Sequence, residues 1–106
     1  MTYGGVQFDA LGDGTRRAIL ARLLNGPLAV GELARDLPVS RPAISQHLRI
    51  LKEADLVLHQ SVGARHVYRL NPAGFETLRQ YLDVYWAQAL EAFANEVERR
   101  ARQELQ

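Results

Sequence analysis

Polar and basic side chains suited to hydrogen bonding with nucleic acid gather between residues 40 and 52. Ser45 and Gln46 are short and neutral, which suits close approach to a base edge, and a glutamine amide pairs naturally with adenine. Arg41 carries a planar guanidinium, which makes bidentate contacts with phosphate and guanine. By residue type alone, these side chains could equally be solvated residues on the surface of a helix. They are predicted to contact bases if the surrounding elements present them to DNA.

Neighbouring residues suit the DNA backbone rather than the bases. Arg49 and Lys52 are predicted to contact phosphates, which fix the register of a protein on DNA without specifying its sequence. Pro42 could touch a thymine methyl group, although its place in the first turn of a helix explains it equally well. Ser40 is a helix N-cap candidate and completes this predicted DNA-binding segment.

Other kinds of chemistry lack the residues they need. The sequence contains no cysteine, which excludes a disulfide framework, a thiol nucleophile, a thiol redox switch and a Cys-ligated metal. His59 and His66 would need further ligands to hold a metal ion. No Ser/His/acid arrangement and no glycine-rich phosphate loop stands out. We therefore predict no catalytic residues, no metal site and no cofactor, and a protein that is not an enzyme.

The charge is unevenly distributed along the chain. The net charge is +1 overall, but it is 0 over residues 1–39, +3 over residues 40–70 and −2 over residues 71–106. All three histidines lie in the basic middle third, and twelve of the thirteen basic residues are arginine. On charge alone, a solvated arginine-rich surface and a nucleic-acid interface explain this surplus equally well.

The elements that carry these residues follow from hydrophobic spacing and from turn residues. Residues 30–37 have apolar side chains at i, i+3, i+4 and i+7, which predicts two turns of helix. After a tight connector, a second helix begins behind Ser40 and runs to about Ala54, with its buried stripe at Ile44, Leu48 and Leu51. Residues 56–61 and 65–70 are rich in β-formers around a glycine turn, which predicts a hairpin.

Two short helices followed by a hairpin form a winged helix-turn-helix. The second helix of such a pair fits the major groove, which is about 12 Å wide, and offers its polar side chains to base edges. The hairpin, or wing, then reaches over the DNA backbone with Arg65 and His66. The basic third of the chain coincides with these two elements, and this coincidence favours nucleic acid as the ligand.

The rest of the chain is predicted to be helical. A short helix covers about residues 6–12, a second follows Asp13 as its N-cap, and a long last helix covers about residues 72–104. The expected fold is mainly α with a small β-hairpin: one winged-helix domain over residues 1–106, with about five helices and a two-stranded wing.

A wide apolar stripe follows the last helix, and one chain of this size cannot cover it. We expect a second copy to bury it, with an effector pocket at the same place as the alternative. The stripe comprises Leu78, Tyr81, Leu82, Tyr85, Trp86, Leu90, Phe93 and Val97.

Targeting signals are not visible in the sequence. No apolar run approaches the ~18–20 residues that span a bilayer, and the first residues have neither a basic nor an apolar signal region. We expect a soluble protein of the cytoplasm, associated with the nucleoid and not with a membrane.

Several runs together resemble a known family, the ArsR/SmtB winged-helix repressors of bacteria. The resemblance covers about residues 6–72 in the family's order and spacing, and departs from it at Gly14, where proline is usual, and at Asp55, where glycine is usual. The runs that carry it are LGDGTRRAIL (11–20), VGELA (30–34), SRPAISQHL (40–48), LKEADLV (51–57) and VYRL (67–70).

The resemblance implies a homodimeric transcriptional repressor that binds a palindromic DNA operator, with an unknown small-molecule effector as a further candidate partner. The family's metal sites need cysteines near residues 32–36 or a histidine on the last helix, and this sequence has neither. The family dimerises through its first and last helices, which implies an interface made by Phe8, Leu78, Leu82, Tyr85, Trp86, Leu90 and Phe93.

A winged helix that binds another protein is the alternative function. Such a module would have an apolar or acidic second helix in the pair, whereas residues 41–52 here are polar and basic.

Overall fold

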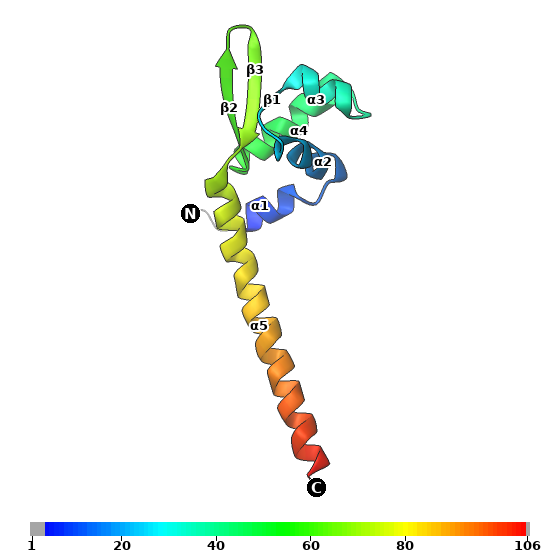
Figure 1. Cartoon of the computed structure of the whole chain (residues 1–106), viewed down its shortest axis with the longest axis vertical. Coiled ribbons are helices and arrows are strands. Elements are labelled where there is room, and N and C mark those ends of the chain that lie inside the picture. The colour runs from blue at the N-terminus through cyan, green and yellow to red at the C-terminus, as the bar shows by residue number, and fades with distance from the viewer. Residues whose placement is uncertain (1–3, 106) are drawn as a thin grey trace.

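The computed structural model describes residues 4–105, which form five helices and one three-stranded sheet (Figure 1). This confirms the predicted winged helix-turn-helix. The elements in chain order are α1 (Gly5–Ala10), α2 (Gly14–Leu23), β1 (Leu28–Ala29), α3 (Val30–Asp36), α4 (Arg41–Glu53), β2 (Val57–Val62), β3 (Arg65–Leu70) and α5 (Pro72–Glu104).

Polar side chains cap the N-terminal ends of three helices, two of them at the predicted residues Asp13 and Ser40. The side chains of Asp13, Ser40 and Asn71 each accept a hydrogen bond from a backbone N–H in the first turn, at 3.0, 3.3 and 3.2 Å. Such caps satisfy N–H groups that have no partner within the helix. Asp55, just beyond α4, adopts the left-handed conformation with φ +60° and so ends that helix sharply.

The wing is a hairpin with one extra strand beside it. β2 pairs with β3 in antiparallel register from Val57↔Leu70 to Val62↔Arg65, and Gly63 turns the chain at φ +61°. β1 adds two residues to the other edge of β3, so the predicted two-stranded wing is part of a three-stranded sheet. A strand of two residues is too short to show an alternating pattern in the sequence.

The core lies beneath α4 and fixes its orientation. The buried side chains of α4 are Ile44, Leu48 and Leu51, which pack with Ile19 from α2 and Leu33 from α3. All five side chains are fully buried. Since the core occupies one side of α4, the opposite side of the helix faces solvent.

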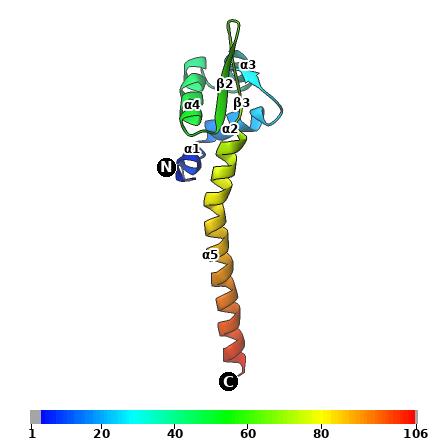
Figure 2. The ribbon, with the colours of Figure 1, turned by 90° about the vertical axis from the view of Figure 1, so that its left-hand side faces the viewer.

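Helix α5 projects away from this compact head (Figures 1 and 2). Its first turns pack against α1, and Gly74 and Leu78 are its only buried residues in the described part of the chain. The protein is 73 Å along its longest axis, with the wing and the free end of α5 at opposite ends. Within residues 4–105, no helix combines the length and apolar character that crossing a bilayer requires.

Candidate nucleic-acid interface

The solvent-facing side of α4 carries the residues predicted to contact DNA. All of them lie on the surface, while the apolar residues of the same helix face the core. This segregation follows the 3.6-residue period of the helix. The exposed residues at the start and along the outer side of α4 are Ser40, Arg41, Pro42, Ser45, Gln46, Arg49 and Lys52.

The C-terminal end of α4 is held from two sides. The Gln7 side chain on α1 is 1% exposed, and its Nε2 donates to the Ala54 carbonyl at 2.7 Å. On α5, Gly74 lies so close that a Cβ at this position would be 1.7 Å from the Asp55 carbonyl oxygen. Both contacts fix where the exposed side of α4 points relative to α1 and α5. Sequence analysis missed Gln7, since an isolated glutamine gives no signal of burial.

Two histidines stack on the wing. The rings of His59 and His66 are 5.1 Å apart between centroids, and His59 Nε2 lies 3.0 Å from His66 Nδ1. Burial lowers the pKa of His59, and the charges of Lys52 and His66 lower it further. His66 is exposed, as a DNA contact from the wing requires, but its ring is held by its neighbour on β2.

The guanidinium of Arg65 pairs with the carboxylate of Glu32 on α3. The same Glu32 oxygen accepts the backbone N–H of Ala29 at 3.1 Å and so caps the start of α3. Glu32 therefore joins the tip of the wing to the helix pair. Sequence analysis did not identify Glu32 as part of the site, because the residue at the N-cap position is alanine and gives no capping-box pattern.

Most of the predicted dimer-interface residues form an exposed apolar stripe. Leu82 is half-buried and Leu78 is already buried within the chain itself, at 7% exposure. The remaining five, which are 49–69% exposed, are Phe8, Tyr85, Trp86, Leu90 and Phe93.

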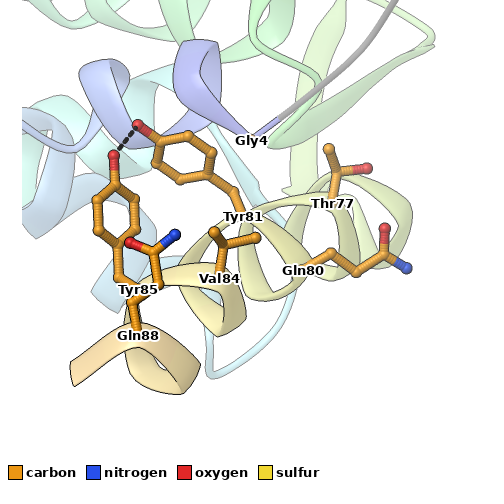
Figure 3. Close-up of a pocket in the computed structure, with 7 residues that line it drawn as sticks. All are labelled: Gly4, Thr77, Gln80, Tyr81, Val84, Tyr85 and Gln88. Carbon is orange, nitrogen blue, oxygen red and sulfur yellow. Dashed lines mark hydrogen bonds between the residues drawn. The ribbon is translucent and has the colours of Figure 1, made fainter. Parts of the chain in front are cut away.

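A hollow of about 480 Å³ lies along α5 where the N-terminal end of α1 meets it. Figure 3 shows the side chains of Tyr81 and Tyr85 beside it, with their hydroxyl groups 3.1 Å apart. Gly4 forms one wall, and the other lining residues come from α5. The hollow therefore adjoins the exposed stripe.

Metal-ligating side chains do not converge anywhere between residues 4 and 105. No group of three or more His, Asp or Glu residues there is arranged to hold an ion. The two histidines of the wing have Ser61 Oγ as their nearest additional polar contact, 3.4 Å from His66 Nδ1.

Known proteins resemble this chain in both sequence and fold. Residues 13–58, from the N-cap of α2 into β2, match the family model "Bacterial regulatory protein, arsR family". The "HTH-type transcriptional regulator Rv2034" of Mycobacterium tuberculosis is 61% identical over 87 residues, which cover 82% of this chain and 81% of that protein. The "Transcriptional repressor SdpR" of Bacillus subtilis is 41% identical over 64 residues, covering 60% of this chain and 71% of that protein.

A solved crystal structure has a similar fold over most of the chain. The crystal structure of a "Possible transcriptional regulator for arsenical resistance" superposes with a TM-score of 0.74 at 39% identity, covering 85% of this chain and 94% of that one. The match therefore extends over most of both chains. By sequence and by fold, this chain belongs to the arsR family of bacterial regulatory proteins.

Proposed function

We propose that this protein is a sequence-specific DNA-binding repressor of transcription, which acts as a homodimer on a palindromic operator. The observation that carries the proposal is the outer side of α4, where polar and basic side chains are exposed directly opposite the core. Winged-helix proteins of the arsR family are transcriptional regulators rather than enzymes. We place its action in the cytoplasm, on the nucleoid.

The side chains of α4 divide into two roles. Arg41, Ser45 and Gln46 hydrogen bond to base edges in the major groove and so select the sequence. Arg49 and Lys52 neutralise phosphates and so hold the protein on any duplex. The wing adds Arg65 and His66 beside the adjoining backbone.

A second copy completes the operator-binding form. Trp86, Leu90 and Phe93 are each more than 60% exposed and leave an apolar stripe that a partner's α5 can bury. A two-fold dimer presents two α4 helices to half-sites about 34–36 Å apart. The hollow beside Tyr81 and Tyr85 adjoins this surface and is the place we assign to a small-molecule effector.

The alternative function, a winged helix that binds another protein, fits α4 less well. Protein interfaces are depleted of charged side chains at their centre and enriched in apolar and aromatic ones. The exposed side of α4 has Arg41, Arg49 and Lys52, and no exposed aromatic residue.

Substitutions of Gln46 and Arg65 test the proposal. Gln46→Ala should weaken binding to an operator selected from random duplexes by about 1–3 kcal/mol and leave random DNA nearly unaffected, because only a base contact is lost. Arg65→Ala should weaken both and reduce the salt slope by about one, because a phosphate contact is lost. Fluorescence anisotropy over a series of salt concentrations measures both quantities.

Gln103→Ala, at the far end of α5, is the matched control and should change neither DNA affinity. Equal losses on operator and random DNA for Gln46→Ala would contradict the role of α4 in sequence selection. A wild-type protein with no preference for any duplex would contradict the proposed function as a whole.

A further inference from the structure

A polar hollow of about 380 Å³ lies where the wing meets the helix pair. Its walls come from the tip of the wing, from α3 between Val30 and Arg35, and from the start of α4. Three arginines line it, Arg35, Arg41 and Arg65, together with one acidic residue, Glu32. The arginines outnumber the acid, so the hollow has a positive surplus.

The Arg65 guanidinium is occupied by Glu32 but not buried. Its side chain is 63% exposed, and the Glu32 side chain is 33% exposed. Ion pairs at this exposure contribute little to stability, because water screens both charges. Arg65 can therefore leave Glu32 at small cost when a better anion arrives. A phosphate offers such an anion, because its oxygens match the fork of a guanidinium.

The position of the hollow determines which phosphate reaches it. Arg41 is both the first residue of α4 and part of the wall, and its guanidinium lies 3.9 Å from the place where a Cβ on Gly31 would stand. The first residues of a recognition helix are the ones that approach the bases. The hollow therefore lies at the rim of the DNA-binding surface, where the backbone of a duplex passes from α4 to the wing.

We propose that this hollow binds one phosphate of the DNA backbone, and that Arg65 exchanges the carboxylate of Glu32 for that phosphate when DNA arrives. In the free protein, Glu32 keeps the wing arginine in place beside α3; in the complex, Arg35 and Arg65 hold the phosphodiester, while Arg41 remains on the bases. The inference rests on the proposed function and deepens it, since it adds Arg35 to the DNA contacts and gives Glu32 an opposing role.

Glu32→Gln separates the two tasks of Glu32. A glutamine oxygen can still accept the Ala29 N–H, so the cap of α3 is kept while the negative charge beside Arg65 is removed. We expect operator and random DNA to bind about two- to fivefold more tightly, the range in which an exposed ion pair contributes. In an Arg65→Ala background, the same substitution should give no gain, because no guanidinium remains to be released.

Asp36→Asn is the matched control. Asp36 lies on the same helix and pairs with Arg22 at 3.4 Å, but it does not line the hollow, so its loss should leave DNA affinity unchanged. An equal gain from Asp36→Asn, or a gain from Glu32→Gln that persists without Arg65, would show a general charge effect and overturn the exchange. Unchanged or weaker binding by Glu32→Gln would overturn it too.

Arg35→Ala tests the site by removing a cation that would bind the phosphate. It should weaken binding to both kinds of DNA and reduce the salt slope by about one, whereas Arg22→Ala should change neither. An Arg35→Ala protein with unaltered DNA affinity would remove Arg35 from the site and overturn the inference. If the wild-type protein selects an operator through Gln46 but Glu32→Gln and Arg35→Ala do not change DNA affinity in the expected directions, the inference fails and the proposed function stands.

The second source of a phosphate for this hollow is a free phosphate ion from solution. Inorganic phosphate at millimolar concentration, in buffer of matched ionic strength, should raise the melting temperature of the wild-type protein no more than it raises that of Arg35→Ala. A stabilisation by free phosphate that Arg35→Ala removes would identify a site for small anions and overturn the assignment to DNA.

Discussion

His59 shows how one side chain makes the wing sensitive to acid. Burial, together with the charges of Lys52 and His66, lowers its pKa, so the folded wing favours the neutral ring. An unfolded chain binds a proton at His59 near the usual pKa of about 6.5, while the folded chain does not. The unfolded state therefore holds more protons below this pH, and stability must fall as the solution becomes more acidic.

The pH dependence of unfolding measures this effect. The free energy of unfolding of the wild-type protein, measured with urea, should be highest above about pH 7 and should decrease from there towards pH 5. His59→Gln should have a shallower slope in this window. Asp13, Glu76 and Glu96 have lowered pKa values, each chiefly through a hydrogen bond to its carboxylate, so their contributions are lost only at lower pH. Identical slopes for the two proteins would contradict this account of His59.

At the residue scale, the sequence predicts what depends on near neighbours and misses what depends on register. Asp13 and Ser40 were identifiable as caps because a cap contacts a backbone N–H only three residues away. The contact between Arg65 and Glu32 joins residues 33 positions apart, and that between His59 and His66 requires the exact pairing of β2 with β3. A shift of one residue in that pairing would turn each ring to the opposite side of the sheet.

At the scale of elements, Gly74 at the start of α5 lies against the backbone of Asp55, just beyond α4, and leaves no room for a side chain. An alanine in place of glycine near the start of a helix normally stabilises it by up to about 1 kcal/mol. At Gly74 the new Cβ would overlap the backbone of Asp55, which cannot move without displacing the end of α4.

Two substitutions of the same type should therefore have opposite signs. Gly14→Ala in α2 should be neutral or stabilising, because its Cβ meets only the flexible end of Arg17 at 3.6 Å. Gly74→Ala should destabilise by about 2 kcal/mol or more, the cost of overpacking against backbone. Thermal and urea unfolding of both variants provide the comparison. A stabilising Gly74→Ala would mean that α5 does not pack on α4 in this way.

Element boundaries followed from the sequence wherever periodicity extended over several turns. The prediction for α5 began at Pro72 and ended near Glu104, as in the structure, because a proline start and a long apolar stripe both mark it. The predicted first helix, 6–12, differs from α1 at Gly5–Ala10, because six residues contain too few turns to show a period. The site on α4 was predictable for the same reason as the helix, whereas its coupling to Gln7 was not.

At the scale of the whole molecule, the exposed stripe on α5 predicts self-association. Trp86→Gln combined with Leu90→Gln should convert a dimer into a monomer, because two large apolar side chains leave the interface. Operator affinity should then fall towards the non-specific range of about 10⁻⁴–10⁻⁶ M, since one α4 reaches only one half-site. Sedimentation and a parallel binding titration measure the two effects.

Glu91→Gln combined with Asn95→Gln is the control, because these positions have the same i, i+4 spacing on the opposite side of α5. This pair should leave both the dimer and the operator affinity unchanged. A wild-type monomer that binds a palindromic site tightly would refute the dimer.

The separation of the wing from the free end of α5 also has a kinetic consequence. The basic third of the chain lies in the head, whereas residues 71–91 have a net charge of −2 and residues 92–106 a net charge of 0, so positive and negative charge are separated between the head and the first part of α5 in the 73 Å molecule. At physiological salt, charges are screened beyond about 8 Å, so the surplus acids of residues 76–91 hardly weaken a complex formed at the wing. In dilute salt the field reaches further, and DNA attracts the head of the protein while it repels the acidic first part of α5. Diffusing molecules then arrive with the head towards the duplex, and α5 speeds productive encounters without touching DNA.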